Sequence, residues 1–198
     1  MAVGAQAVRT HRPFQSDESL ILLKDIQENP QDFVMAIERY SCSVVSIIGW
    51  GRRISRKEDP IVERALAVMH QAAQIFVPGD YWMETLPILQ KLPAWLYALP
   101  TQLRVGRMAM AGYWYALTKE GAETGKDTCF SKMLLAQASE LLSKEQIAGL
   151  TSSLIGGGVD TTTSTMLSFI LACVAFPEAI EPARKEIDTV VGQNRMPN

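Results

Sequence analysis

Apolar residues recur at steps of three and four over most of the chain, which is the spacing of one face of an α-helix. One such stripe consists of Phe33, Ile37, Tyr40, Val44 and Ile48. It predicts a buried helix face, which we expect to end at Gly49 and Gly51 because glycine is common where a helix stops. No alternating strand pattern and no internal repeat stands out. The pattern therefore predicts an all-α fold class.

Capping residues and prolines divide this pattern into helices. A first helix is expected over residues 16–29, where acidic residues follow Ser16. The pairs Asn29–Pro30 and Asp59–Pro60 each place a capping residue before proline at the first helical position. The second pair follows a charged linker, GRRISRKEDP, and begins a stripe of Ile61, Ala65, Met69, Ala72 and Phe76 that Pro78 and Gly79 end. Further helices are expected over residues 101–121 and 130–138.

The segment YWMETLPILQKLPAWLYALP, residues 81–100, differs from its neighbours. Its prolines interrupt the tryptophans and tyrosines too often for one straight helix, so it predicts a broken apolar connector. Two interpretations stay open. The connector is either buried under neighbouring elements, or exposed as a patch that touches a membrane surface or admits apolar ligands.

A long helix is predicted after Ser143. Ser143 and Gln146 have the spacing of a capping box, and no proline follows until Pro177. An uninterrupted helix here would have roughly 33 residues and span ~50 Å. This is well above the usual length of a helix in a globular protein.

The middle of this helix, TSSLIGGGVDTTTST, carries the candidate chemistry. Each glycine costs ~1 kcal/mol relative to alanine in a helix, so another interaction must offset that cost. A structural interpretation is that the run is a loop between two helices, or that its small residues let another helix approach closely. A functional interpretation is that the glycines let a flat ligand lie against the backbone. Positions 153, 157, 161 and 165 share one face and are small or hydroxylated, so that face could border a cavity. Asp160 and Thr161 would present an acid and an alcohol beside the ligand.

Composition and charge argue against several classes of function. The 19 basic and 21 acidic residues leave no basic excess for nucleic acid. The odd number of cysteines and their wide separation fit reduced thiols, and His11 and His70 lack zinc spacing, so no metal site from these side chains is expected. The glycine run lacks the P-loop lysine and the third glycine of a dinucleotide fingerprint, and no G-x-S-x-G elbow occurs.

Membrane and secretion signals are also not expected from the sequence. The opening residues contain no apolar h-region, which a secretory signal requires. The longest nearly apolar run, Met166 to Phe176, is shorter than the ~18 residues of a membrane span.

Several motifs occur in the order found in one family. GGVDTT at 157–162 resembles the [AG]-G-x-[DE]-T-[TS] motif on the long helix I of the cytochromes P-450. FPEAIEPARKEIDTVVGQNRMP, at 176–197, is similar to the family's next helix and its E-I-D-x-V-V-G ending. Residues 14–53 look like a segment of fungal and other eukaryotic members, and 86–96 resemble the connector at the substrate entrance. The resemblance implies that residues 1–198 are the middle of one cytochrome P-450 domain, centred on helix I.

This resemblance implies a haem-dependent monooxygenase that uses dioxygen to hydroxylate or oxidise a small apolar organic substrate. It also implies an NADPH-dependent reductase as partner and, for a full-length member, the endoplasmic reticulum membrane as location. Gly157, Gly158 and Thr161 are implied to contact haem. Asp160 and Thr161 are implied to pass protons towards dioxygen, which must be protonated when its O–O bond is split.

Three further residues receive roles from the same resemblance. Thr162 is expected to support a local bend of the helix. Ser153 and Thr165, together with Gly157, are expected to line the substrate pocket.

Parts of the family pattern are missing. The haem-ligand loop, phenylalanine-x-x-glycine-x-arginine-x-cysteine, does not occur, and none of Cys42, Cys129 and Cys173 has those neighbours, so the axial thiolate is not in this chain. Glu181 and Arg184 match the family's E-x-x-R letters but lie in the wrong helix. The N-terminal anchor and the haem-binding loop are therefore expected to be missing. The alternative is an inactive helical remnant without haem, acting as a binding module or an inert product.

Overall fold

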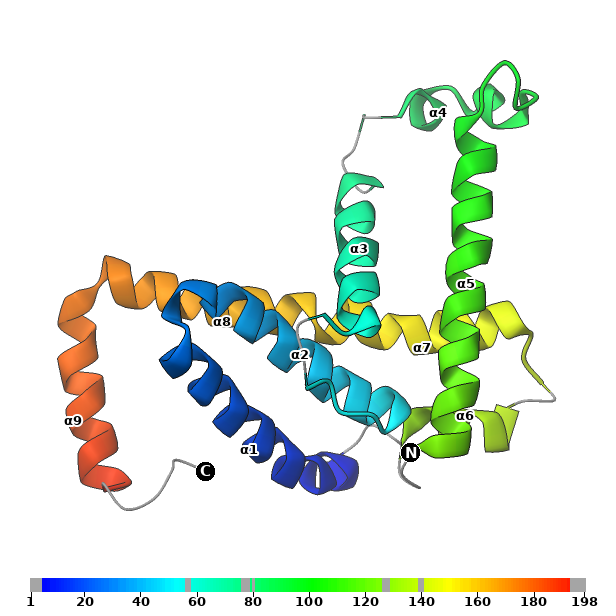
Figure 1. Ribbon diagram of the computed structural model, residues 1–198. Helices are drawn as coiled ribbons and strands as arrows, with labels where there is room; N and C mark the ends of the chain where they lie inside the picture. Colours follow the sequence, from blue (N-terminus) through cyan, green and yellow to red (C-terminus); the bar gives the residue numbers. More distant parts are fainter. Residues whose placement is uncertain are drawn as a thin grey trace. The chain divides into compact units, whose positions relative to one another are not determined.

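The computed structural model describes residues 5–55, 58–75, 79, 81–125, 129–138 and 141–192, and these form helices without a strand (Figure 1). The chain divides into two compact units, residues 1–160 and 161–198. The first contains α1 (Ala5–Glu28), η1 (Pro30–Asp32), α2 (Phe33–Trp50), α3 (Pro60–Ile75), α4 (Trp82–Thr85), η2 (Pro87–Lys91), α5 (Leu99–Thr124), α6 (Phe130–Ala138) and α7 (Lys144–Gly158). The second unit contains α8 (Asp160–Ala175) from its second residue on, followed by η3 (Pro177–Ala179) and α9 (Ile180–Val190). The predicted all-α fold class is confirmed.

Two of the predicted helix boundaries have the expected local cause. The Asp59 carboxylate accepts a hydrogen bond from the Ile61 backbone N–H at 2.9 Å, which caps α3 just before Pro60. α2 ends at Gly51, whose φ of 71° is left-handed and favours glycine. Gly49, the other expected end, lies inside α2.

The predicted start of the first helix at Ser16 is wrong. α1 begins at Ala5 and continues through Pro13, so the acidic residues after Ser16 lie inside the helix and not in its first turn. The Ser19 hydroxyl donates to the Ser16 carbonyl at 2.8 Å, a bond between turns that a helix-interior serine commonly makes. Asn29 precedes η1, but its side chain donates to the Asp32 carboxylate and makes no capping bond to backbone.

The predicted stripe on α2 is only partly correct, because α2 is surrounded. Of its five residues only Ile37 is fully buried, and the others are partly exposed. Helices α1, α5, α6 and α7 all pack on α2, so polar residues are buried as well, and Arg39 and Ser43 take partners there. The Ser43 hydroxyl accepts the Ile54 backbone N–H at 3.1 Å, which anchors the middle of the charged linker against α2.

Buried charges join α1 to α2. Arg39 donates to the Glu18 carboxylate at 3.0 Å and to the Asp25 carboxylate at 3.0 Å. Arg53 lies 2.6 Å from the other Glu18 oxygen. Because Glu18 and Arg39 are almost completely buried, removal of either one would leave the other with a single charged partner, Arg53 for Glu18 and Asp25 for Arg39.

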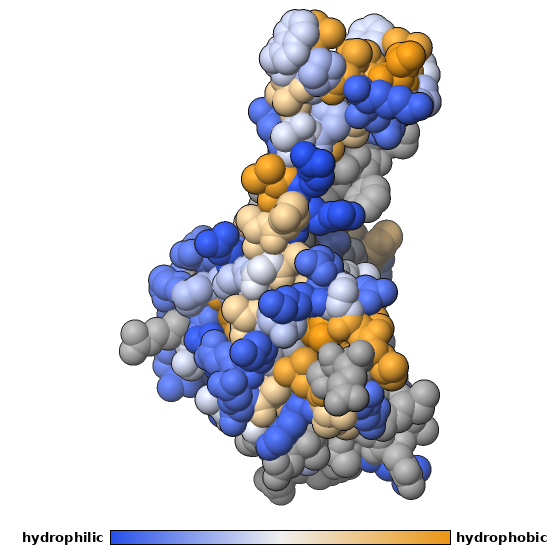
Figure 2. Space-filling view, turned by 90° about the vertical axis from the view of Figure 1, so that its right-hand side faces the viewer, coloured by the Kyte–Doolittle hydropathy of each residue, from blue (hydrophilic) through white to orange (hydrophobic). Residues whose placement is uncertain are grey.

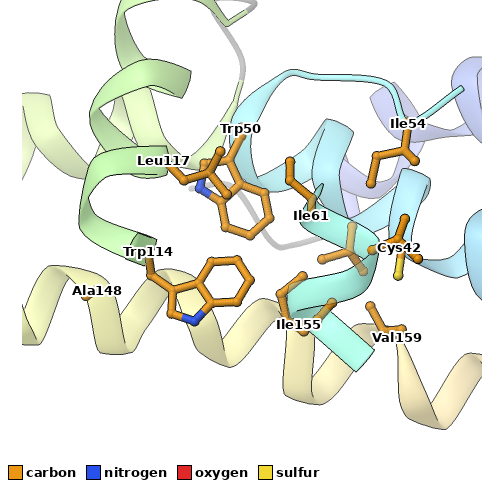
Figure 3. Packing of buried hydrophobic residues seen from close by; sticks show 12 residues of the cluster. Cys42, Trp50, Ile54, Ile61, Trp114, Leu117, Ala148, Ile155 and Val159 are labelled. Atoms are coloured by element: carbon orange, nitrogen blue, oxygen red, sulfur yellow. The ribbon is translucent and has the colours of Figure 1, made fainter. Parts of the chain in front are cut away.

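The hydrophobic core of the first unit lies where α2, α3, α5 and α7 meet (Figure 3). At its centre the Trp50 and Trp114 rings are stacked, with centroids 5.6 Å apart. Gly121 on α5 permits this approach, because a Cβ there would lie 2.9 Å from the Trp50 Cβ. The cluster consists of Cys42, Val45, Trp50, Ile54, Ile61, Val62, Ala65, Trp114, Leu117, Ala148, Ile155 and Val159. Ile61 and Ala65 confirm the start of the stripe predicted for α3, whereas the side chains of Met69, Ala72 and Phe76 lie outside the described residues.

From the apolar runs in the sequence we expected no membrane span. By length and composition alone, however, two helical stretches, Pro30–Trp50 and Lys144–Ala175, are long and apolar enough to cross a membrane. Core helices of soluble proteins have the same properties; the most apolar part of the first stretch is 56% buried and that of the second is 11% buried. The second unit leaves Phe169, Leu171 and Val174 exposed.

Candidate functional site

The long helix predicted after Ser143 is present as α7 and α8, with one residue, Val159, between them. The Ser143 hydroxyl accepts the Gln146 N–H at 3.2 Å and the Gln146 side chain accepts the Ser143 N–H at 2.8 Å, so the capping box is confirmed. The Val159 N–H still donates to the Ile155 carbonyl at 3.0 Å. The glycine run is therefore helical, and its interpretation as a loop is wrong.

The three glycines of the run have different surroundings. A Cβ on Gly158 would lie 2.5 Å from the Val45 Cγ2 atom, so the missing side chain allows α7 to pack closely on α2. A Cβ on Gly156 or Gly157 would meet no described atom within 4 Å. The run thus has one side that packs against α2 and one open side against which a flat group could lie.

The acid and the alcohol of the motif are adjacent in the chain and exposed. Asp160 stands in the first turn of α8, where the helix dipole favours a carboxylate. Thr161 follows, and its carbonyl accepts the Thr165 hydroxyl at 2.7 Å. This bond from a threonine to the preceding turn is of the kind that bends helices. Thr162 is half-buried, and its expected support of the bend stays a prediction.

The remaining predicted pocket residues are also on exposed surface. In the first unit, Ser153 is exposed, like Gly157 one turn later, and the Ser153 hydroxyl donates to the Leu150 carbonyl at 2.7 Å. In the second unit, Thr165 is exposed, as is Thr161. None of these residues lines the open cavity of about 260 Å³ found in the first unit, which is bordered by Asp17, Ile47, Gly51 and Arg53.

The open side of the glycine run leaves room for a flat group such as haem, but two of the three cysteines, Cys42 and Cys129, are buried in the interior and not available to its iron. Cys42 is fully buried, and this burial raises the pKa of its thiol to about 12. The buried Cys129 thiol donates to the Gly121 carbonyl. Within the part of the chain that the structure describes, no group of three or more histidine, cysteine or acidic side chains could hold a metal ion. The open surface can therefore take one face of a flat group, and half-buried Cys173 is the one described cysteine that is not enclosed in the interior.

A buried pair of hydroxyls just before the glycine run was not predicted from the sequence. The Thr118 hydroxyl on α5 lies 3.0 Å from the Thr151 hydroxyl on α7, and each is bonded to a carbonyl of its own helix. This pair and its packing hold α7 against α5 two turns before Val159. A threonine in an apolar helix face is a weak signal, and it does not identify a partner 33 residues away.

Known proteins of one family resemble nearly the whole chain. Residues 12–198 match the family model described as Cytochrome P450. The cytochrome P450 monooxygenase polD of Polytolypa hystricis is 31% identical over 201 residues, covering 98% of this chain and 39% of the relative. The monooxygenase alnH of Emericella nidulans is also 31% identical, covering 96% of this chain and 36% of the relative.

A third relative gives the same picture. Cytochrome P450 monooxygenase 45 of Postia placenta is 28% identical and covers 94% of this chain. The match includes 38% of that relative, so the chain spans about two fifths of the length of the curated relatives that it matches.

Proposed function

This chain belongs to the cytochrome P450 family, and from that premise we propose that it is the dioxygen-side part of a haem-dependent monooxygenase, with Gly157, Asp160 and Thr161 at the reacting centre. Membership makes the protein an oxidoreductase by family. The observation that carries the finer proposal is the open side of the glycine run, directly before an exposed acid and alcohol.

The residues of this chain would hold the group and supply protons. Haem, when bound, supplies the activation of dioxygen. Gly157 would let a flat ring lie against the α7 backbone, because glycine has no side chain and no described atom lies within 4 Å of where its Cβ would be. Gly158 keeps the same turn close to α2, so that the open surface has a firm support. The thiolate that would bind the haem iron would come from outside the residues described here.

Asp160 and Thr161 would deliver the protons that splitting the O–O bond requires. A hydroxyl can accept a proton on one side and donate one on the other, and a carboxylate can exchange protons with water. The Thr161 carbonyl is already bonded to Thr165, which fixes the local backbone. A proton held at the Thr161 Oγ1 atom would be passed on and replaced through Asp160.

Substrate, partner and location follow as parts of the same proposal. The substrate would be a small apolar organic molecule, bordered by Ser153, Gly157 and Thr165. Electrons would come from an NADPH-dependent reductase, and the whole protein would be placed at the endoplasmic reticulum membrane. We do not include nucleic acid among the partners, because the chain has a formal charge of -2.

The first experiment is to sequence the transcript on both sides of residues 1–198. A reading frame that continues into phenylalanine-x-x-glycine-x-arginine-x-cysteine supports the monooxygenase. A stop codon at the end of residue 198 in a complete transcript refutes an active enzyme and supports the inactive helical remnant.

The second experiment uses that longer protein with haem, reductase and NADPH. Thr161→Val removes the hydroxyl but keeps the side-chain shape, whereas Thr161→Ser keeps the hydroxyl. We expect Thr161→Val to lower the product formed per NADPH consumed by about tenfold or more, since a positioned proton donor contributes ~10²–10⁴-fold to the rate, and Thr161→Ser to restore most of it. Equal coupling in both variants would refute the role of Thr161.

A further inference from the structure

Three aromatic rings in the core of the first unit lie in contact, one after another. The Trp50 ring on α2 is stacked on the Trp114 ring on α5, with centroids 5.6 Å apart and planes inclined by 20°. The Trp114 ring meets the ring of Tyr113, the preceding residue, edge to face with centroids 5.0 Å apart. Both distances lie within the roughly 4.5–7 Å at which aromatic pairs interact. Figure 3 shows the two indole rings next to each other among the apolar side chains, so the three rings form one continuous path.

The path runs from the interior towards the surface. Trp50 and Trp114 are each only 1% exposed, whereas Tyr113 is partly exposed. The Arg64 guanidinium of α3 lies over the Tyr113 ring, 5.3 Å from its centroid. A cation in this place disfavours a positive charge on the ring, so Tyr113 should lose its phenolic proton when it loses an electron. Burial raises the pKa of the Tyr113 phenol, so that proton is present at neutral pH.

Neither buried indole N–H has a hydrogen-bond partner among the described residues. The Nε1 atoms of Trp50 and Trp114 are both enclosed in the core without an acceptor. A buried polar group without a partner is uncommon, and a redox role is one of the reasons for which such a group occurs. An oxidised indole normally releases its N–H proton to an acceptor and is then trapped as a neutral radical. Without an acceptor the positive charge stays on the ring, which can take an electron from its neighbour.

From these contacts we propose that Trp50, Trp114 and Tyr113 form a path for one-electron oxidation between the core of the first unit and its surface. A one-electron oxidant strong enough to oxidise an indole removes one electron from either tryptophan and leaves a radical cation. An electron then moves from Tyr113, through Trp114 where Trp50 was oxidised, and restores the tryptophan. The Tyr113 O–H bond breaks, its proton passes to water, and a neutral phenoxyl radical remains, so charge and atoms balance.

This path goes beyond the oxygenase proposal and does not depend on it, since all three residues belong to the first unit. The other two tryptophans of the chain, Trp82 and Trp95, lie on the connector and are 72% and 85% exposed. Of the two interpretations that the sequence left open for the connector, burial under neighbouring elements is therefore wrong. Figure 2 shows hydrophobic residues at the surface at the top, where the connector lies. Trp82→Phe/Trp95→Phe should thus leave the core intact and make Trp50 and Trp114 the only tryptophans.

The test is laser flash photolysis of the 198-residue chain that carries Trp82→Phe/Trp95→Phe. Ultraviolet photoionisation removes an electron from a buried tryptophan, and dissolved dioxygen takes up that electron. The absorption of the tryptophan radical cation should then decay while the absorption of a tyrosine phenoxyl radical grows at the same rate. Adding Tyr113→Phe should remove most of the phenoxyl signal. The matched control Tyr115→Phe, two residues further along α5, should keep it.

Two further variants test the order of the rings. Trp114→Phe leaves Trp50 as the only tryptophan and replaces the middle ring with one that is much harder to oxidise, so growth of the phenoxyl signal should slow strongly. Trp50→Phe leaves the contact between Trp114 and Tyr113 and should keep the fast growth. The emission of the remaining tryptophan stays that of a buried indole if the core is folded. Decay of the tryptophan radical without phenoxyl growth, a signal that survives Tyr113→Phe, or unchanged growth after Trp114→Phe would each overturn the inference.

Discussion

Gly158 and Gly157 are neighbours in α7, yet the structure predicts opposite results when each is changed to alanine. Alanine is favoured over glycine in a helix by up to about 1 kcal/mol, and this gain applies at both positions. At Gly157 a new methyl group meets no described atom within 4 Å, so Gly157→Ala should stabilise the chain by up to about 1 kcal/mol.

At Gly158 the same methyl group would lie 2.5 Å from Val45 Cγ2. Val45 is buried and β-branched within a helix, so its side chain has few other rotamers available. Overpacking of this kind costs about 1–3 kcal/mol. Because the helix gain is common to both variants, Gly158→Ala should be less stable than Gly157→Ala by about 1–3 kcal/mol.

Equilibrium unfolding in urea, followed by the fluorescence of the buried tryptophans, measures this difference at low protein concentration. Val45→Ala removes the atom that clashes. In the Val45→Ala background, Gly158→Ala should therefore cost much less stability than it does in the unchanged chain. Equal midpoints for Gly157→Ala and Gly158→Ala would refute the close packing of α7 on α2. A coupling energy near zero in the double-mutant cycle would do the same.

Other expectations concern charge, thiols, cofactor and solubility. Arg39→Met should destabilise the chain by up to about 3 kcal/mol in urea unfolding, because buried Glu18 loses one of its two arginine partners and keeps only Arg53. The exposed Lys24→Ala should change stability by no more than about 0.5 kcal/mol. Since burial raises the pKa of the Cys42 thiol to about 12, a thiol reagent at pH 8 should leave Cys42 unlabelled until urea unfolds the chain. Half-buried Cys173 should react first, and rapid labelling of Cys42 in the folded chain would contradict this. The 198-residue chain expressed with haem should show no thiolate-type carbon monoxide band. Such a band would show that one of its own cysteines can bind the iron, contrary to the prediction. Its exposed apolar residues should make it poorly soluble, and a monodisperse monomer on sizing would count against that.

The sequence by itself determined several helix ends and the order of the motifs, because these signals act over a few residues. The capping box at Ser143, the Asp59–Pro60 start and the left-handed Gly51 each depend on local backbone and side-chain geometry. The motif GGVDTT is likewise read from adjacent letters, whereas the sequence left open whether its glycines form a loop or a helix.

Only the tertiary structure decided which surface of each helix is covered. Gly157 and Gly158 have the same letter, and it is Val45, more than a hundred residues earlier, that makes one of them a packing position. Likewise, α2 buries polar residues beyond its predicted stripe because several helices surround it, and the connector is exposed because no helix among the described residues covers it. Burial depends on partners distant in sequence, and no periodicity within a single helix reveals how many partners it will have.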